Sequence, residues 1–443
     1  MKLTRLPAEQ AFLVAAEVPA RGELWTAGES LEELAQLAAT AGLRVAGRLS
    51  QRLAEPNPFT YIGKGKLEAL AAELRTDGVA TVLFDDELTP AQTRNIGRVL
   101  GDGIKVLDRT ALILDIFAQH AQSREGQIQV ETAQYAYLLP RLTGLWTHLI
   151  RQAGGRSAGG YGVGLRGPGE TQLETDRRRV RRRIETLRRQ LEEVRRARGE
   201  VYRRRRRGEL ATAVLVGYTN AGKSSLLNAL CRLQGVDAED GGPPLAYVAD
   251  QLFATLDPTT RRIRLPSGTP ILITDTVGFI KKLPPHLVAA FRATLEGIGQ
   301  ADLLLHVADA AHPMAQAQVD TVRRILSELE VTDKPVLLIW NKIDGLGQGV
   351  NPDDLPGAGA IPLSAWTGAG LDRLLAALDR AVQARLVEVE VEIPYSRPEL
   401  QSRVFRQGAV DWYEHGENGT RIRAHVPAAL AAALAPYGGS RLS

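Results

Sequence analysis

Residues 211–225, ATAVLVGYTNAGKSS, run from small and branched apolar residues directly into a glycine-containing loop. The apolar run is typical of a buried strand, and the loop fits the pattern G-x-x-x-x-G-K-[ST] at the start of a helix. Glycines let backbone N–H groups converge on a phosphate at the positive end of that helix. The stretch therefore predicts an α/β domain that carries a phosphate-binding loop.

The residues of this loop have separate expected roles. Lys223 should reach the β and γ phosphates of a nucleotide, and Ser224 should ligate Mg²⁺. The predicted nucleotide-binding residues of the loop are Gly217, Tyr218, Thr219, Asn220, Ala221, Gly222, Lys223, Ser224 and Ser225.

Two later stretches predict which base is bound. In NKID, residues 341–344, the Asp344 carboxylate can accept hydrogen bonds from both N1–H and the exocyclic amine of guanine. Adenine offers neither donor in that arrangement, a mismatch worth roughly 10⁴-fold in selectivity. Asn341 should tie this loop to the phosphate loop, and the Lys342 stem should lie along the base. A backbone N–H of SAW, residues 364–366, could meet guanine O6. The predicted base-site residues are Asn341, Lys342, Ile343, Asp344, Ser364, Ala365 and Trp366.

Two further stretches are expected to sense the γ-phosphate. In DTVG, Asp275 should hold Mg²⁺ through water and the Gly278 N–H should meet the phosphate. In FATLDPTTR, Thr255 is the candidate threonine that closes on Mg²⁺; were it only a turn residue, Thr259 or Thr260 would take that role. The additional nucleotide-binding residues are Phe253, Ala254, Thr255, Leu256, Asp257, Asp275, Thr276, Val277 and Gly278. The expected catalytic residues are Lys223, Thr255 and Gly278, and the expected direct metal ligands are Ser224 and Thr255.

The residue after Gly278 bears on the rate of hydrolysis. Ras-like enzymes place a water-orienting glutamine there, whereas this chain has Phe279 followed by Ile280. An apolar side chain cannot align a water, so we expect slow intrinsic turnover. A group supplied by another part of the chain or by a partner would be needed, and help in trans can give 10³–10⁵-fold.

The composition limits what the rest of the chain can be. A chain of 443 residues should form two to four domains. It has no apolar run of membrane-spanning length, and the N-terminus MKLTRLPAEQ lacks the apolar core of a signal peptide. A single cysteine, Cys231, excludes an intramolecular disulfide and suits a reducing cytoplasm. One cysteine and seven histidines assemble no structural zinc spacing.

Positive charge is concentrated between residues 111 and 207. This segment holds 21 Arg, no Lys and 10 Asp plus Glu, a balance of +11 within a net charge of +4, so the remainder carries −7. Such asymmetry indicates a polyanionic target. Residues 151–169, rich in glycine and arginine, should form the tip of a helical hairpin that stays flexible until a partner orders it. The arginine helix could instead be a solvated face, and Arg203–Arg207 could be only a charged linker.

Apolar spacing predicts that the two arms of this hairpin pack as a coiled coil. In the second arm the stripe residues are Val180, Ile184, Leu187, Leu191, Val194 and Val201, with Arg198 at the missing position. The partner is expected to be one preceding helix, through Leu112, Leu114, Phe117, Ile128 and Tyr135.

The alternation of strand and helix patterns predicts a multidomain α/β architecture. The four expected parts are an α/β N-terminal domain over 1–110, the basic helical hairpin over 111–207, a P-loop GTPase domain over 208–383 with a mostly parallel sheet and helices on both faces, and a small α+β domain over 384–443. Thr89 is expected to N-cap a helix before Pro90.

Three short stretches or residue pairs each allow two interpretations. Residues 61–66, YIGKGK, are either a glycine turn before a helix or a second phosphate site. His120 and His148 are expected to be packing residues of the hairpin rather than catalysts. Trp412 and Tyr413 are either core residues or a pair that stacks on RNA bases.

Longer phrases resemble the HflX family of GTPases, in the translation-factor-like branch of P-loop GTPases. They are GYTNAGKSSLLNAL, LFATLDPTTR, DTVGFI, GVGLRGPGETQLETDRRRVRRRI, NPFTYIGKGKLEAL and VLFDDELTPAQTRNI. The likeness covers nearly all of the chain before the tail. One departure is Trp366, where the family usually has lysine after Ser-Ala, which puts stacking against the base in doubt.

The resemblance implies a GTPase that binds the large (50S) ribosomal subunit and separates stalled ribosomes. We expect a cytoplasmic protein, in part peripheral at a membrane, and a monomer, because the domain plan gives no evident dimer seam. It implies that the N-terminal domain and the hairpin contact ribosomal RNA, where arginines meet phosphates and stack on bases. The expected RNA contacts are Arg151, Arg156, Arg166, Arg177, Arg178, Arg181 and Arg182. The alternatives are a GTPase of large-subunit assembly and an RNA-binding or RNA-remodelling module in which GTP is secondary.

Overall fold

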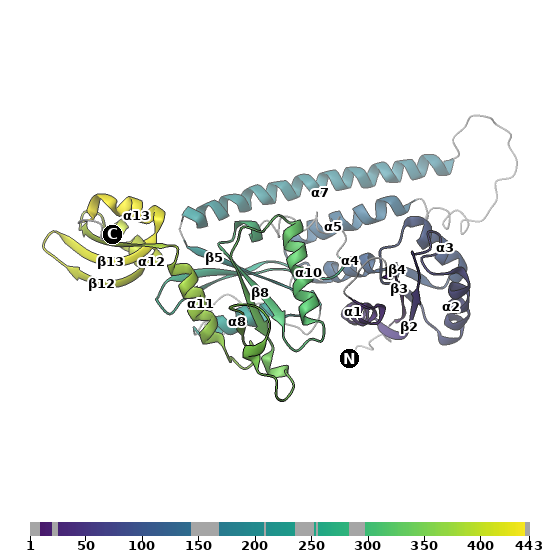
Figure 1. Ribbon diagram of the computed structural model, residues 1–443. Coiled ribbons are helices and arrows are strands. Elements are labelled where there is room, and N and C mark those ends of the chain that lie inside the picture. The colour runs from purple at the N-terminus through teal and green to yellow at the C-terminus, as the bar shows by residue number, and fades with distance from the viewer. Residues whose placement is uncertain are drawn as a thin grey trace, which may run out of the picture. The chain divides into compact units, whose positions relative to one another are not determined.

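The computed structural model describes residues 9–19, 25–142, 168–207, 210–234, 252–253, 256–282 and 297–438, without the side chains of 77, 168–173, 195 and 197–207. The multidomain α/β fold class is confirmed (Figure 1). The chain divides into two compact units. Unit 1 comprises Met1–Val194, Gln251–Leu256 and Lys281–Arg292; unit 2 comprises Arg195–Asp250, Asp257–Ile280 and Ala293–Ser443. No helix within the described ranges is long and apolar enough to cross a membrane.

Unit 1 is built on a four-stranded parallel sheet. Its strands are β1 (Gln10–Glu17), β2 (Arg44–Arg52), β3 (Thr81–Phe84) and β4 (Lys105–Asp108), in the order β2-β1-β3-β4. The connecting helices are α1 (Ala27–Thr40), α2 (Lys64–Asp77) and α3 (Pro90–Leu100). One apolar cluster joins sheet and helices, and includes Phe12, Val14, Leu67, Leu70, Val82, Phe84, Ile96 and Leu100. The alternation of strands and helices expected for the N-terminal domain is present here.

Local hydrogen bonds determine where the helices of unit 1 begin. Thr89 is the N-cap of α3 as predicted: its hydroxyl accepts from the Gln92 N–H at 3.2 Å, and Gln92 Oε1 accepts from the Thr89 N–H at 2.9 Å. Gly63 precedes α2, and its own N–H donates to Gln51 Oε1 at 2.8 Å. That bond favours the turn reading of residues 61–66 over a second phosphate site.

The segment after β4 corrects one prediction. The expected single helix before the tip is two helices, α4 (Arg109–His120) and α5 (Arg124–Leu138), followed by a short 3₁₀ turn η2 (Leu139–Arg141). The hydroxyl of Ser123 caps α5 by accepting from the Gly126 N–H at 2.9 Å. His120 is half-buried in the last turn of α4, and His148 lies outside the described residues.

The long arginine helix α7 (Pro168–Arg207) packs on α5. Leu187 and Leu191 form a buried cluster with Ile128, against which Tyr135 packs. Leu112, Leu114 and Phe117 are buried on the separate helix α4 and do not belong to that cluster, so their part of the predicted seam stays a prediction. The side chains of Arg198 and Val201 and residues 151–167 of the tip lie outside the described part of the chain.

Unit 2 contains a six-stranded sheet in the order β10-β9-β8-β5-β7-β6. All pairs are parallel except β6 with β7. The strands are β5 (Ala211–Gly217), β6 (Thr259–Arg264), β7 (Pro270–Asp275), β8 (Leu303–Asp309), β9 (Val336–Asn341) and β10 (Ile361–Pro362), and the helices α8 (Lys223–Arg232), α10 (Ala315–Glu328) and α11 (Leu371–Gln383). A core cluster of sheet and helix residues includes Leu215, Leu227, Ile271, Leu305, Ile339 and Leu374, with Cys231.

The C-terminal part of unit 2 is a small α+β module. Its elements are β11 (Leu386–Pro394), α12 (Pro398–Gln407), β12 (Ala409–His415), β13 (Gly419–Pro427), α13 (Ala428–Leu434) and the 3₁₀ turn η6 (Ala435–Tyr437). The three strands are antiparallel in the order β11-β13-β12. In the hairpin between β12 and β13 the Gly416 N–H donates to the Gly419 carbonyl at 2.8 Å. Trp412 is 39% exposed and Tyr413 54% exposed, so the core reading of this pair is wrong.

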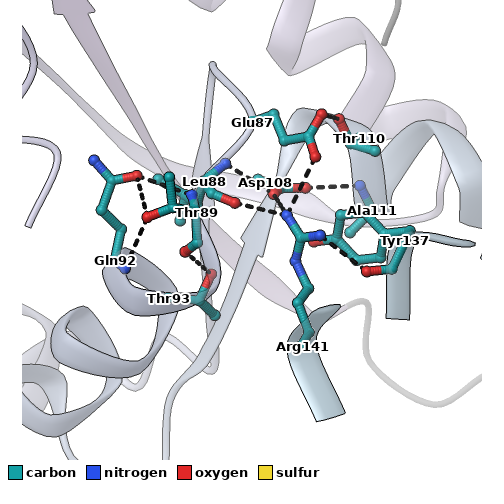
Figure 2. A network of polar contacts seen from close by, with 10 residues as sticks. All are labelled: Glu87, Leu88, Thr89, Gln92, Thr93, Asp108, Thr110, Ala111, Tyr137 and Arg141. Atoms are coloured by element: carbon teal, nitrogen blue, oxygen red, sulfur yellow. Dashed lines mark hydrogen bonds and ion pairs between the residues drawn. The ribbon is translucent and has the colours of Figure 1, made fainter. Parts of the chain in front are cut away.

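A buried polar network ties η2 to the carboxyl edge of the sheet of unit 1 (Figure 2). The Arg141 guanidinium donates to the Leu88 carbonyl at 2.6 Å, lies 3.4 Å from Asp108 Oδ2, and stacks 3.5 Å from the Tyr137 ring centroid. Burial raises the pKa of the Asp108 carboxyl, against the hydrogen bonds from the Ala111 and Leu88 N–H groups and the charge of Arg141. The network anchors the end of α5 and η2 to the sheet of unit 1.

Replacing Arg141 with Met should destabilise the chain more at pH 7 than at pH 4.5. Losing the guanidinium charge raises the pKa of Asp108 further, and a carboxyl whose folded pKa is raised loses stability as pH rises above its unfolded pKa. Each further rise of one unit in the pKa of Asp108 corresponds to about 1.4 kcal/mol of folding free energy at pH 7. Thermal unfolding of the full chain followed by circular dichroism at both pH values measures this.

The control is Arg178→Met, which removes an exposed arginine that pairs with Glu174 on α7 at 3.1 Å. Its effect on Tm should be small and alike at both pH values. An equal loss of Tm at pH 7 and pH 4.5 for Arg141→Met would contradict the assigned role.

Candidate functional site

The phosphate-binding loop lies between the end of β5 and the start of α8. Gly222, the N-cap of α8, has a left-handed backbone with φ 88°. A Cβ at this position would lie 2.2 Å from Asn341 Nδ2. Both the conformation and the close approach therefore require glycine at Gly222.

Lys223 is enclosed by the loop that it belongs to. Its side chain is 6% exposed, and Nζ donates to the carbonyls of Tyr218 at 2.8 Å and Gly217 at 3.3 Å. Burial lowers the pKa of Lys223 to about 8, although the charge of Asp275 acts in the opposite direction. A buried ammonium of lowered pKa is well suited to gain a phosphate as its partner.

The remaining loop residues are placed as follows. Tyr218, Thr219 and Ala221 are buried, Ser225 is half-buried in the first turn of α8, and Asn220 is exposed with φ 59°.

Ser224 and Asp275 come together at the ends of α8 and β7. The Ser224 hydroxyl donates to Asp275 Oδ2 at 2.6 Å, and Asp275 is fully buried. A hydroxyl and a carboxylate oxygen are hard donors of the kind that Mg²⁺ prefers alongside phosphate oxygens. Among the described residues no group of three or more His, Cys, Asp or Glu could hold a metal ion. The fit to magnesium therefore depends on these two oxygens and on the nucleotide.

The DTVG segment lies directly against the phosphate loop. A Cβ at Gly278 would be 2.7 Å from Thr219 Cα and 2.9 Å from Lys223 Nζ, so a larger residue would not fit without displacement. The Phe279 N–H donates to the Gly217 carbonyl at 3.0 Å, and the Phe279 carbonyl accepts from the Thr219 N–H at 2.8 Å. Thr276 and Val277 are buried, and the Phe279 side chain is only 1% exposed.

Asn341 joins the predicted base site to the phosphate loop. Its Nδ2 donates to the Ala221 carbonyl at 2.9 Å, and its Oδ1 accepts from the Ala365 N–H at 2.9 Å. The Ser364 hydroxyl donates to Asp344 Oδ1 in a short hydrogen bond. Ser364 is fully buried while Asp344 is exposed, so the carboxylate is oriented from beneath and open toward a base.

The flanking residues of the base site differ in exposure. Lys342 adopts a left-handed backbone with φ 62°, and its Nζ lies 2.8 Å from Asp309 Oδ2. Ile343 is half-buried in the 3₁₀ turn η4 (Ile343–Gly345). Trp366, the residue that departs from the family pattern, is 88% exposed. Asp309 was not predicted as a site residue, although it lies at the carboxyl end of the parallel strand β8.

The FATLD stretch is divided. Ala254 and Thr255 lie outside the described residues, so the magnesium role of Thr255 stays a prediction. Phe253 and Leu256 are buried in unit 1, whereas Asp257 is half-buried in unit 2. Of the two alternatives to Thr255, Thr260 lies in β6 with its hydroxyl 3.0 Å from that of Thr274, and Thr259 pairs with Asp275 across β6 and β7.

The predicted RNA-contacting arginines are described only in α7. Arg151, Arg156 and Arg166 fall outside the described residues. Arg177 is half-buried and Arg178 pairs with Glu174. Arg181 and Arg182 are exposed, and no ion pair to either is seen among the described side chains.

Because Lys223 is partly deprotonated above pH 8, binding of a nucleotide phosphate should take up a proton. At pH 8.5 a lysine of pKa about 8 is roughly three-quarters deprotonated, and a bound phosphate raises that pKa. Titration calorimetry with GDP in two buffers of different ionisation heat should show uptake of about 0.75 proton. At pH 7.5 the uptake should fall to about a quarter of a proton. Equal uptake at both pH values would contradict this pKa.

Four family models match successive stretches of the chain. They are GTP-binding GTPase N-terminal over residues 28–118, GTP-binding GTPase Middle Region over 120–206, 50S ribosome-binding GTPase over 212–342, and HflX C-terminal domain over 357–435.

Similar proteins are found in several bacteria. GTPase HflX of Caldanaerobacter subterraneus subsp. tengcongensis is 43% identical over 401 residues, which is 90% of this chain and 87% of that protein. GTPase HflX of Escherichia coli strain K12 is 41% identical over 87% of each chain. A GTP-binding protein from the hyperthermophilic archaeon Sulfolobus solfataricus, solved in complex with GDP, is 26% identical over 85% of this chain and 99% of that one, with a TM-score of 0.41. The chain belongs to the HflX family of GTPases.

Proposed function

We propose that this chain hydrolyses GTP with Mg²⁺ while bound to the large ribosomal subunit, and that its GTP state separates stalled ribosomes into subunits. The observation that carries the proposal is the Asn341 side chain, which joins the phosphate loop to the predicted guanine loop. This geometry lies in a domain that matches the 50S ribosome-binding GTPase model over residues 212–342.

The proposed chemistry assigns each group one task. Lys223 holds the β and γ phosphates, the Gly278 N–H meets the γ-phosphate, and Asp344 selects guanine. Ser224 would hold Mg²⁺ directly and Asp275 through water, with Thr255 joining in the GTP state. When bound, the ion neutralises charge on the phosphates.

Intrinsic hydrolysis is proposed to be slow. Phe279 occupies the position of a water-orienting glutamine, and its backbone is bonded to the phosphate loop. Its apolar ring cannot orient a water. The large subunit would therefore supply or position the missing group, which can give 10³–10⁵-fold in related systems.

The basic helix α7 is proposed to contact ribosomal RNA. Arg181 and Arg182 present exposed guanidinium groups, which suit phosphates and stacking on bases. Arg183, in contrast, donates to Glu131 Oε1 at 2.7 Å, so it supports the packing of α7 on α5. The proposed RNA-facing arginines are thus distinct from the structural one beside them.

Gradient sedimentation with intact ribosomes and separated subunits tests the proposed function. The monomeric chain loaded with a non-hydrolysable GTP analogue should cosediment with large subunits and reduce the intact ribosome peak, whereas the GDP-loaded chain should do neither. Adding large subunits should also speed GTP hydrolysis in a single turnover. Equal cosedimentation with GDP and the analogue would overturn the proposal.

Sedimentation and RNA binding together separate the two alternatives. Association with immature large subunits only would indicate a role in assembly. Undiminished RNA binding by a fragment ending near Gly208, regardless of nucleotide, would indicate an RNA-binding module in which GTP is secondary.

Replacing Arg181 and Arg182 together with Gln should weaken binding to the large subunit. Each lost phosphate contact should also reduce the slope of log affinity against log salt by about 0.7–0.9, since fewer counterions are released. Filter binding between 50 and 200 mM salt measures both effects. The matched control is the exposed pair Arg323 and Arg324 on α10, changed in the same way. Equal effects of the two double variants would contradict a specific role for α7.

A further inference from the structure

The carboxyl edge of the sheet of unit 1 is a place where parallel sheets bind ligands. In the order β2-β1-β3-β4 the chain leaves β1 for one side and later returns to its other side at β3. A crevice opens at the carboxyl ends of such a strand pair. Asp85 and Asp86 directly follow β3, and the Asp85 N–H donates to the Val14 carbonyl of β1 at 2.9 Å.

Lys282, a residue about 200 positions later in the sequence, lies at this edge. Lys282 belongs to unit 1, and its Nζ lies 2.6 Å from Asp85 Oδ2 and 2.6 Å from Asp86 Oδ1. Lys282 is 18% exposed and Asp85 1% exposed. Burial alone would lower the pKa of Lys282, but the two carboxylates raise it. The ammonium is therefore charged and shared by two carboxylates.

The backbone beside Lys282 is held as well. The Arg109 guanidinium, 1% exposed, donates to the Lys281 carbonyl at 3.0 Å and to Asp85 Oδ1 at 2.9 Å. It also pairs with Glu33 of α1 at 2.5 Å. We call Asp85, Asp86 and Arg109 the clamp. Lys282 has a left-handed backbone with φ 58°, which a lysine rarely adopts without such support.

The residue that the clamp holds is only a few residues from the phosphate-sensing glycine. Gly278, Phe279, Ile280, Lys281 and Lys282 are consecutive. At one end of this stretch the Phe279 backbone is bonded to Gly217 and Thr219; at the other the Lys282 side chain is bonded to Asp85 and Asp86. The four steps from Gly278 to Lys282 span at most about 14 Å, so a shift of Gly278 beyond the slack of this stretch has to move Lys282.

The other phosphate-sensing stretch is also anchored in unit 1. The Phe253 ring packs edge to face on Phe117 of α4, with centroids 4.6 Å apart. The Leu252 N–H donates to Thr40 Oγ1 at 3.3 Å. Phe253 precedes the candidate Thr255 by two residues. Both stretches that should respond to a γ-phosphate are thus bonded to the N-terminal part of the chain.

We propose that Lys282 is a positioning residue of the GTPase cycle, which the clamp holds so that the stretch after Gly278 stays in the arrangement described here, and that GTP binding draws Lys282 out of the clamp. The proposal rests on the proposed function, because it requires a GTP site at Lys223 and Gly278. Coupling between two sites is reciprocal: if the contacts of Lys282 with the clamp weaken GTP binding, GTP binding weakens those contacts by the same factor. The conformation of unit 1 then depends on which nucleotide is bound.

Affinities of the full chain for GDP and for a non-hydrolysable GTP analogue test this proposal. Lys282→Met should tighten binding of the analogue relative to GDP by about tenfold, within the usual range of coupling between sites. The GDP affinity itself should change less than twofold. Turnover of GTP should show a lower KM with little change in kcat, which general damage to the fold would not produce.

Two further variants keep the test open if Lys282→Met folds poorly. Asp86→Asn, at a side chain 14% exposed, leaves the Arg109–Asp85 pair intact and should shift the ratio in the same direction by a smaller factor. Lys282→Arg keeps the charge and should stay within about threefold of the wild-type ratio. The combination of Lys282→Met and Asp86→Asn should shift the ratio no further than Lys282→Met alone.

The matched control is Lys105→Met, which removes a lysine from the same sheet that pairs with Glu9 at 3.0 Å. It should leave the ratio unchanged. The proposal fails if Lys282→Met and Asp86→Asn both behave like Lys105→Met, or if they weaken the analogue relative to GDP. If the wild-type chain bound no guanine nucleotide, or sedimented with ribosomes regardless of nucleotide, the proposed function would fail instead.

Discussion

The amide of Asn341 is the group on which the nucleotide site depends. The amide nitrogen donates to the Ala221 carbonyl in the phosphate loop, and the amide oxygen accepts from the Ala365 N–H in the loop after β10. Three loops far apart in the sequence are thereby set at fixed distances. The same amide fills the space where a Cβ of Gly222 would lie. Gly222 of the phosphate loop therefore has to be glycine because Asn341, from a distant motif, occupies the adjacent space.

Unit 1 is organised around charges that have been removed from water. Arg109 and Asp85 are each 1% exposed, and isolated charges at such depth would be strongly unfavourable. They are tolerated because each has several partners: the carboxylate meets Arg109, Lys282 and Ser30, and the guanidinium meets Glu33 as well. Buried pairs of this kind add little net stability, but they favour one arrangement over others. Because these pairs favour one arrangement, a change at the nucleotide site that breaks them would change the conformation of unit 1, as we propose for Lys282.

Some errors of sequence interpretation have local causes and others do not. The break between α4 and α5 was marked by Ser123, a good N-cap, but the apolar spacing continued across it and suggested one helix. Trp412 and Tyr413 are large aromatic residues of the kind often found in a core, and only the structure shows that both are exposed on β12. The acidic run after β3 was quoted as part of a family phrase, yet nothing in its local pattern indicated that a lysine about 200 residues later would meet it.

The sequence by itself determined the α/β alternation of strands and helices and the position of the phosphate loop at the start of α8. These features depend on spacing within a few residues, because backbone hydrogen bonding, side-chain periodicity and helix capping are local. Only the tertiary structure decided which helix packs on α7, that Asn341 and Gly222 share one space, and that Lys282 meets Asp85 and Asp86. Contacts between distant residues depend on how whole elements pack. The sequence shows that a residue is charged, but not which residue of opposite charge will lie beside it in the folded chain.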